Sequence, residues 1–243
     1  MREITSTANE LVKETVKLHQ KKYRDKFILI EGKKAVEEAI AAKLKVKYIF
    51  VQNENEYKKY ETYLVSEAVL KKVSTTESPA NVVGVFEKPV YCLDAFKKFK
   101  KIVLLDNIKD AGNLGTIIRA CSAFGIEGIL LFGDTTDEFS PKTIRSSAGN
   151  MFKIPVLKIK FEELKEFKKT HRFLATVCRS DKFLNDYKIK SDLIVMFGSE
   201  ADGLCKELLN LADDKVTIKM TNNVESLNLA LSAGVVLYEL QNL

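Results

Sequence analysis

The chain has 243 residues, of which 46% are hydrophobic and 30% are charged, and its formal net charge is +6. These proportions are those of a globular protein, and they exclude a fibrous repeat and a largely disordered chain. The length suits one large domain or two smaller ones, and we expect two. The four cysteines and two histidines lack the close spacing of a zinc site or a redox pair, so we expect free thiols and no metal site.

The first part of the chain has the pattern of a small α/β domain. Thr7 and Glu10 fit a capping box, which predicts a helix from Ala8 to His19. Short apolar runs and helical stretches then alternate, and Ser66 is suited to cap a helix that ends at Val73. The predicted elements are strands over 27–30, 47–52 and 82–86 and a helix over 33–43. Because Pro89 is followed by a lysine-rich stretch, we expect a linker near 88–96, a first domain over 1–92 and a second over 93–243.

Basic residues are concentrated between Lys13 and Lys26, where six lysines and arginines face two acidic residues, a local excess of 6 − 2 = +4. Such a cluster is suited to contact the phosphates of a nucleic acid. It is also typical of a solvated helix face, and charge alone favours that second interpretation.

The N-terminus is polar, and no apolar run reaches the length that spans a membrane. We therefore expect a cytoplasmic protein with no membrane partner.

From residue 102 onward, apolar strands again alternate with helical stretches. This order predicts an α/β domain with a largely parallel sheet that is covered on both faces. In such sheets ligands bind beyond the carboxyl ends of the strands, so the loops that follow strands are the candidate sites. The predicted strands cover residues 102–105, 128–132, 173–177, 193–197 and 216–218.

Three of these loops carry polar residues in unusual settings. The first is Asn113-Leu-Gly115, with Arg119 six positions after Asn113 on an otherwise apolar helix that we expect from Thr116 to Phe124. An arginine there pairs either with a structural carboxylate or with a ligand phosphate. The second is the glycine-bordered turn around Glu200. The third is Ser226-Leu-Asn228, where Ser226 is suited to cap a long apolar helix and Asn228 lies in its first turn.

In this order, the three segments resemble the motifs of the SpoU-type (TrmH-like) family of SPOUT RNA methyltransferases. Ser140 to Gly149 is similar to a further element of that family, and the N-terminal region resembles its small, ribosomal-protein-like substrate-binding domain. One departure is Ala111, where a proline is common, and it concerns the stiffness of the loop more than the chemistry.

The resemblance implies a C-terminal domain with a trefoil knot, which no propensity argument would suggest because knots are rare. It implies that S-adenosylmethionine is bound at Gly198, Ile218 and Leu227, with Met220 and Thr176 as further candidates. It also implies a homodimer that methylates a ribose 2′-hydroxyl in RNA, with ribosomal RNA as the favoured substrate. The implied catalytic residues are Arg119, Asn113, Glu200, Ser226 and Asn228.

Arg119 occupies the family's position for the base that activates the hydroxyl, but a guanidinium stays protonated in proteins. The alternative is that it binds the RNA phosphate and stabilises the developing alkoxide, held by Asn113 and Glu200. A transfer RNA substrate and a non-catalytic RNA-binding protein are the competing functions. A Rossmann-type nucleotide enzyme is disfavoured because the fingerprint G-x-G-x-x-G is absent after every predicted strand.

Overall fold

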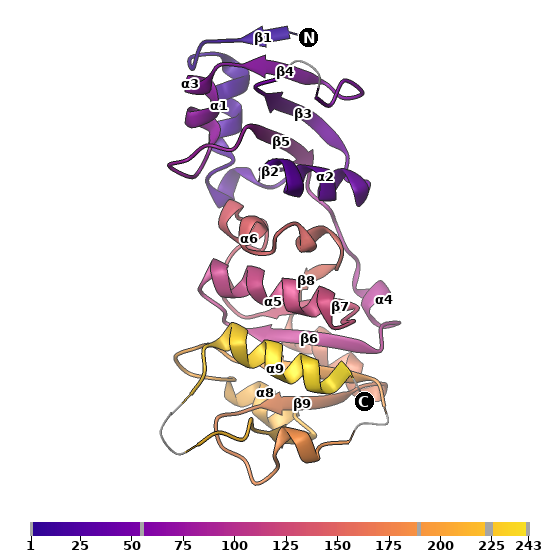
Figure 1. The fold of residues 1–243 in the computed structure, drawn as a ribbon. Helices are drawn as coiled ribbons and strands as arrows, with labels where there is room; N and C mark the ends of the chain where they lie inside the picture. Colours follow the sequence, from indigo (N-terminus) through magenta and orange to yellow (C-terminus); the bar gives the residue numbers. More distant parts are fainter. Residues whose placement is uncertain (1, 54–55, 189–190, 222–225, 242–243) are drawn as a thin grey trace. The chain divides into compact units, whose positions relative to one another are not determined.

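The computed structural model describes the chain except for residues 1, 54–55, 189–190, 222–225 and 242–243 (Figure 1). The described residues pack into two units. Unit 1 consists of Met1–Val90 and Asp137–Phe152, and unit 2 of Tyr91–Thr136 and Lys153–Leu243. The chain therefore passes between the units three times, and the second stretch of unit 1 is an insertion within the sequence of unit 2.

Unit 1 is built on a mixed sheet in which the strand order is β1-β4-β3-β5-β2. Strand β5 runs antiparallel to both of its neighbours, whereas β3, β4 and β1 run parallel to one another. Apolar side chains of the sheet pack with those of α1 and α3 to form one core, which includes Val12, Phe50, Val69 and Val85. The strands are β1 (Arg2–Ile4), β2 (Phe27–Glu31), β3 (Val46–Val51), β4 (Thr62–Val65) and β5 (Val82–Glu87). The helices are α1 (Glu10–Lys17), the short η1 (Lys21–Tyr23), α2 (Lys33–Ala41) and α3 (Glu67–Val73).

The start of α1 differs from the sequence prediction. The capping residue is Asn9, whose side chain accepts a hydrogen bond from the amide of Leu11 at 2.9 Å. The predicted Thr7–Glu10 capping box is therefore wrong, because Asn9 supplies the acceptor two residues later and Glu10 is already helical. The predicted cap of α3 is confirmed, since the Ser66 hydroxyl accepts from the amide of Val69 at 3.4 Å.

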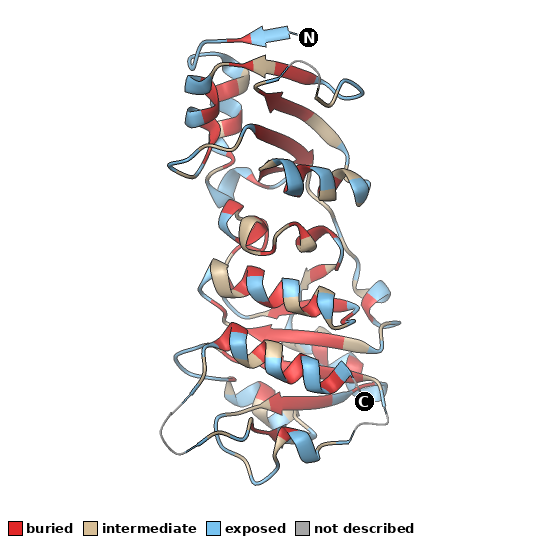
Figure 2. Cartoon of the chain, viewed as in Figure 1, coloured by how far each residue is buried: buried red, intermediate tan, exposed pale blue. Residues whose placement is uncertain are grey.

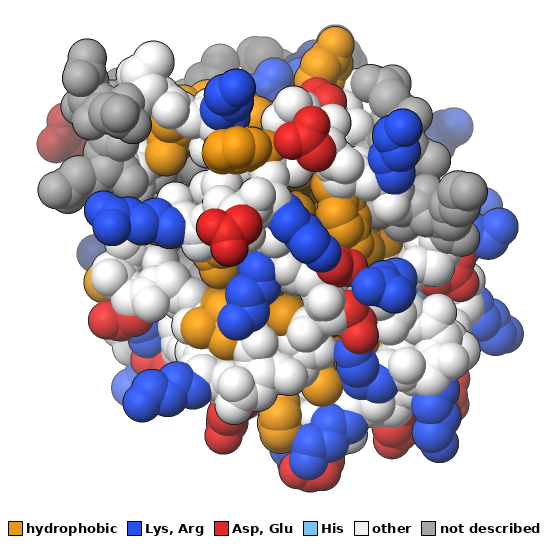
Figure 3. All heavy atoms as spheres, turned by 90° about the horizontal axis from the view of Figure 1, so that it is seen from below, with side chains coloured by type: hydrophobic (Ala, Val, Ile, Leu, Met, Phe, Trp, Pro, Cys, Tyr) orange, Lys and Arg blue, Asp and Glu red, His pale blue; other side chains and the backbone are white. Residues whose placement is uncertain are grey.

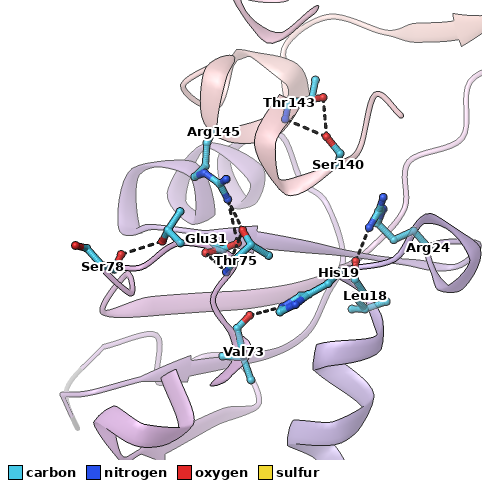
Figure 4. Close-up of polar contacts among 11 residues, drawn as sticks. Leu18, His19, Arg24, Glu31, Val73, Thr75, Ser78, Ser140, Thr143 and Arg145 are labelled. Carbon is cyan, nitrogen blue, oxygen red and sulfur yellow. Dashed lines mark hydrogen bonds and ion pairs between the residues drawn. The ribbon is translucent and has the colours of Figure 1, made fainter. Parts of the chain in front are cut away.

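The inserted stretch of unit 1 contains α6 (Pro141–Ser146) and η2 (Asn150–Phe152), and two arginines bind it to the rest of the unit, one of which is Arg145 (Figure 4). Arg145 on α6 donates to the Glu31 carboxylate at 3.2 Å and to the Thr75 hydroxyl at 2.5 Å. Arg24 donates to the Asp137 carboxylate, from Nε at 2.9 Å and from Nη2 at 2.5 Å. Glu31 and Asp137 are both buried. Buried carboxylates need such partners, because an unpaired buried charge is costly.

Unit 2 is built on a six-stranded sheet in the order β11-β9-β10-β6-β7-β8, and every pair of neighbours is parallel. This confirms the predicted parallel sheet. The strands are β6 (Lys101–Asp106), β7 (Gly128–Phe132), β8 (Val156–Lys158), β9 (Arg172–Thr176), β10 (Leu193–Phe197) and β11 (Asp214–Val216). The last strand lies two residues earlier than predicted, so that Ile218 belongs to the loop that follows it.

Helices cover the sheet of unit 2, whose central strands β6 and β10 are buried except at Lys101, the first residue of β6 (Figure 2). Side chains of α4, α7 and α8 pack in one core with alternate residues of β6, such as Ile102 and Leu104. Helices α5 and α9 pack against each other. The helices are α4 (Leu93–Phe96), α5 (Ala111–Ala123), α7 (Phe161–Lys165), α8 (Lys206–Leu211) and α9 (Leu229–Gln241), with short η3 (Glu166–Lys169) and η4 (Leu184–Asp186) turns. Helix α4 lies within the stretch expected to be a linker. No helix of the described residues is both long and apolar enough to cross a membrane.

Candidate active site

The candidate site lies at the carboxyl edge of the unit 2 sheet, where the neighbouring strands β6 and β10 end. In the sheet, β7 and then β8 lie on one side of β6, in the order in which they follow β6 in the sequence. Strand β10 lies on the other side of β6. The order of strands therefore changes direction between β6 and β10, and such points leave a crevice beyond the strand ends in which α/β proteins bind ligands. The segments that follow these two strands contain the first two sequence motifs.

The first motif lies inside α5. Asp110 caps this helix, with Oδ1 accepting a hydrogen bond from the amide of Asn113 at 2.8 Å. The helix therefore begins at Ala111, five residues before the predicted Thr116, because the carboxylate cap satisfies donors of the first turn. Leu114 and Gly115 are buried, so this part of the helix packs into the unit. The side chain of Asn113 extends toward the loop of the second motif.

The second motif is a tight loop closed by its own backbone. Ser199 and Gly203 exchange two amide-to-carbonyl hydrogen bonds, of 3.1 and 3.0 Å. Gly203 has φ +68°, a conformation that favours glycine. At Gly198 a Cβ atom would lie 1.9 Å from the backbone carbon of Gly203. Both glycines of the motif are therefore required by the backbone path of the loop, which presents the exposed Glu200.

The third motif caps α9, with Asn228 in the role predicted for Ser226. The helix begins at Leu229, and Asn228 Oδ1 accepts from the amides of Ala230 at 2.9 Å and Leu231 at 3.2 Å. Ser226 is exposed two residues before the cap. The prediction that Ser226 caps the helix is therefore wrong, because the amide oxygen of Asn228 already serves the free backbone donors. The polar loop before it falls mostly on residues 222–225, outside the described part of the chain.

Hydrogen bonds join the three motifs to one another. Asn113 Nδ2 donates to Glu200 Oε1 at 2.5 Å, and Asn228 Nδ2 donates to Asn113 Oδ1 at 3.2 Å. Asn113 thus links the second motif to the third, because it is bonded both to Glu200 and to Asn228. We call these three residues, Glu200, Asn113 and Asn228, the polar triad. Their separation in sequence is 87 and 115 residues, so only the fold brings them together.

Arg119 is on α5 but apart from this triad. Its side chain is exposed, and within the described part of the chain it makes no hydrogen bond or ion pair. Glu200, which we expected to hold Arg119, is bonded to Asn113 instead. The guanidinium therefore has its donors available for a ligand, which favours the phosphate-binding interpretation over the structural salt bridge.

The residues proposed to bind the cofactor follow strands of the same sheet edge. Gly198 is buried directly after β10, while Ile218, Met220 and Leu227 are half-buried in the chain between β11 and α9. Thr176 ends β9, and its hydroxyl donates to the carbonyl of Met196 on β10 at 2.8 Å. The hydroxyl of Thr176 therefore already has a structural partner.

Asp106 is a residue of this edge that the sequence analysis did not single out as part of the site. It ends β6 and is completely buried. Its Oδ2 accepts from the backbone amide of Cys205 at 2.7 Å, and its Oδ1 accepts from Asn107 Nδ2 at 2.7 Å. The carboxylate thus fixes the end of the second-motif loop, where α8 begins. The sequence did contain a signal for this residue, because an aspartate at the end of an otherwise apolar strand needs hydrogen-bond partners when it is buried.

Two cysteines of this unit, Cys121 and Cys205, do not have the character of nucleophiles. Burial raises the pKa of the Cys121 thiol, and burial is also the main cause that raises the pKa of the Cys205 thiol. Both side chains are therefore protonated near neutral pH, whereas the thiolate is the reactive form. Among the residues that the structure describes, no cluster of histidine, cysteine and carboxylate side chains has the arrangement of a metal site.

Two family models match the chain. Residues 100–238 match the SpoU rRNA Methylase family, and residues 9–84 match the MRM3-like substrate binding domain. The first match covers more than half of the chain and contains all three motifs.

Similar proteins were found among curated sequences and solved structures. An uncharacterized tRNA/rRNA methyltransferase of Synechocystis sp. is 35% identical over 252 residues, which cover 97% of this chain and 92% of the relative. The 23S rRNA (guanosine(2553)-2′-O)-methyltransferase RlmP of Bacillus subtilis is 31% identical, with 99% of this chain and all of the relative covered. The crystal structure of an AdoMet-bound rRNA methyltransferase from Sinorhizobium meliloti superposes with a TM-score of 0.90 at 31% identity, covering 99% and 97% of the two chains.

Proposed function

Because the chain belongs to the SpoU rRNA methylase family, we propose that it transfers a methyl group from S-adenosylmethionine to a ribose 2′-hydroxyl of ribosomal RNA. The observation that carries this proposal is the polar triad, which joins the three motifs at a sheet edge suited to ligand binding. In this proposal residues 1–92 bind the RNA substrate and residues 93–243 form the methyltransferase domain with its predicted knot. We place the reaction in the cytoplasm, in keeping with the bacterial rRNA enzymes among the relatives.

The residues at this edge fit S-adenosylmethionine, which supplies an activated methyl group when bound. The cofactor combines a purine and a carbon chain with polar ends, so it needs apolar surface and backbone hydrogen-bonding groups. Ile218, Met220 and Leu227 offer half-buried apolar side chains, and the loop at Gly198 offers closely spaced backbone groups. We assign these four residues to cofactor binding. Thr176 then fixes the edge between β9 and β10 through its bond to Met196.

In the proposed reaction, Arg119 binds the RNA phosphate beside the target ribose. A guanidinium is a poor base because it stays protonated, but its charge stabilises the alkoxide that develops as the 2′-hydroxyl passes its proton to water and its oxygen takes the methyl group. Asn113, Glu200 and Asn228 hold the loops of the three motifs in register, and Ser226 lies exposed beside them to contact the substrate. The role of this chain is thus to position the ribose and to stabilise negative charge.

The experiment that tests this assignment compares purified wild-type protein with Arg119→Ala and Arg119→Lys in transfer of a labelled methyl group to unmodified ribosomal RNA. We expect Arg119→Ala to lower turnover by about 10²- to 10³-fold, while the affinity for S-adenosylmethionine stays within about twofold. Arg119→Lys keeps the charge and loses the planar fork, so it should recover part of the activity. Near-normal turnover of Arg119→Ala would show that this role is wrong.

We also propose that the protein acts as a homodimer. Helix α9 is apolar around most of its circumference, and yet Leu231, Val235 and Tyr238 are exposed, Leu231 and Tyr238 by more than half (55% and 56%). These side chains and Thr116 and Phe124 of α5 line a shallow groove of about 630 Å³. A helix that is apolar all round is usually buried, and an exposed apolar stripe on it indicates a protein interface. A second copy of the chain is the partner we assign to this groove.

A further inference from the structure

Tyr23 is an exposed aromatic residue in a basic turn of unit 1. It is the last residue of η1, where it follows Lys21 and Lys22, and 43% of its surface is exposed. Single exposed apolar residues are common and need no explanation on their own. Tyr23 differs because of the charges beside it and because of the way the turn is held.

The charges beside Tyr23 are mainly positive and are available to a ligand. Lys21, Lys22 and Lys26 are exposed, and none of them forms an ion pair with a residue of the described part of the chain. Lys22 Nζ lies 5.0 Å from the centroid of the Tyr23 ring, so cation and aromatic surface are presented together. Asp25 is the one acidic residue between Lys21 and Lys26. On the face drawn in Figure 3, by contrast, Lys and Arg side chains are interspersed with Asp and Glu.

The turn that carries Tyr23 is held by hydrogen bonds of the next residue, Arg24. Arg24 is buried, with only 4% of its surface exposed, and its Nη1 donates to the carbonyl of Leu18 at 2.6 Å (Figure 4). The same guanidinium is paired with the buried carboxylate of Asp137. The amide of Tyr23 also donates to the carbonyl of Gln20 at 3.1 Å. The backbone that carries the Tyr23 ring is therefore held by hydrogen bonds, which lowers the entropy that ordering this turn would cost when a ligand binds.

We propose that Tyr23 is a stacking platform for an unpaired base of the RNA substrate, with Lys21, Lys22 and Lys26 binding the flanking phosphates. An aromatic ring beside lysines is the combination that binds single-stranded RNA, since the ring stacks on a base and the cations follow the backbone. The inference rests on the proposed function, because it takes RNA as the substrate. It adds to that function a named contact point and the unpaired state of the bound nucleotide.

Tyr60 provides a matched control within the same unit. It is also exposed, at 37%, and it also follows two exposed lysines, Lys58 and Lys59. The residue after it is the acidic Glu61 instead of a buried arginine, so its turn lacks the anchor that Arg24 gives to Tyr23. Replacing Tyr60 therefore removes an aromatic ring of equal size that also follows two lysines but lies next to a glutamate, without removing the proposed platform.

The experiment measures binding of the full chain to a fluorescent single-stranded RNA of about 12 nucleotides and to a duplex of the same length. Its variants are Tyr23→Ala, Tyr23→Phe and Tyr60→Ala. We expect Tyr23→Ala to weaken single-strand binding by about tenfold, and Tyr23→Phe and Tyr60→Ala to change it by less than about twofold. Duplex binding should change little in all three. An unchanged affinity of Tyr23→Ala, or an equal loss in Tyr60→Ala, would overturn the inference.

A second readout separates this inference from the proposed function. With unmodified ribosomal RNA as substrate, Tyr23→Ala should raise KM by about tenfold and leave kcat and the affinity for S-adenosylmethionine near wild-type values. If wild-type protein transfers no methyl group, the proposed function fails, and the binding measurement still decides whether Tyr23 stacks on RNA. If wild-type protein is active and Tyr23→Ala has a normal KM, only the stacking inference fails.

Discussion

At the scale of single residues, Gly198 is a position at which the backbone path constrains the candidate site. The loop after β10 folds back so closely that the Gly203 backbone occupies the space of a side chain at residue 198. The same loop presents Glu200 to Asn113. A change at Gly198 therefore moves the second motif relative to the first, although Gly198 itself carries no reactive group.

We predict that Gly198→Ala lowers the affinity for S-adenosylmethionine by at least tenfold and destabilises the protein by about 1–3 kcal/mol, because the added methyl group forces backbone atoms apart. Calorimetric titration and thermal unfolding would measure the two effects. Asp202→Ala, in the same loop but exposed, should leave both quantities near wild type. Wild-type cofactor affinity in Gly198→Ala would contradict the assignment of this loop to the cofactor site.

The residues of the candidate site could be selected from the sequence, but their partners could not. Asn113, Glu200 and Asn228 stood out as polar residues in loops after strands, and the structure joins them. The roles at the helix starts were predicted less well. Thr7 and Ser226 have the right chemistry for caps, but Asn9 and Asn228 compete for the same backbone donors and cap the helices. Neighbouring residues with similar capping preference cannot be ranked from the sequence.

At the scale of secondary structure elements, Asp214 connects β11 to the residues on either side of η4. Its carboxylate accepts hydrogen bonds from Lys182 at 2.9 Å, Arg172 at 2.7 Å and the Tyr187 hydroxyl at 3.0 Å. The bonds from Lys182 and Arg172 are the main causes that lower the pKa of Asp214 to about 2. Burial is the main cause that raises the pKa of Tyr187 to about 12.

The lowered pKa of Asp214 predicts a pH-dependent contribution to stability. The folded pKa lies below the ordinary value of 3.8, so the contribution is fully present above about pH 4 and is lost as pH falls toward 2. We expect Asp214→Asn to be less stable than wild type by about 1 kcal/mol at pH 7, a figure reduced for the exposure of both cations. Denaturant unfolding at pH 7 and pH 3 should show a smaller difference at the lower pH. A difference that does not shrink on acidification would show that the carboxylate charge is not the cause.

The strands were the elements that the sequence predicted best. Strands β7 and β10 have the predicted bounds, because continuous apolar runs bounded by polar residues are typical of buried parallel strands. Strands β1, β4 and β8 were not predicted. Each has only three or four residues, which is too short for a pattern of apolar residues to be recognised.

At the scale of the whole molecule, the insertion Asp137–Phe152 is the feature that sequence reasoning missed. It follows β7 in the chain but packs with unit 1. The contacts that hold it join residues more than a hundred positions apart, such as Arg24 with Asp137 and Glu31 with Arg145. Contacts at that distance leave no periodic signal in the sequence, so a simple division of the chain into two consecutive segments was the natural expectation.

The proposed dimer gives a prediction at the same scale. Leu231→Glu places a charge in the apolar groove of α5 and α9, where a partner would have to bury it. We expect light scattering to show a dimer for wild type and a monomer for Leu231→Glu, with similar circular dichroism. Lys142→Glu, on α6, should remain dimeric. A wild-type monomer at micromolar concentration, or a dimer in Leu231→Glu, would contradict this use of the groove.

The central claim, methylation of a ribose in ribosomal RNA, is tested most directly by mapping 2′-O-methylation in total RNA from cells in which the gene is disrupted. We predict that one ribose methylation in ribosomal RNA disappears, that the wild-type gene restores it, and that the Arg119→Ala gene does not. Loss of a base methylation, loss of a methylation in transfer RNA alone, or an unchanged ribose methylation map would contradict the claim.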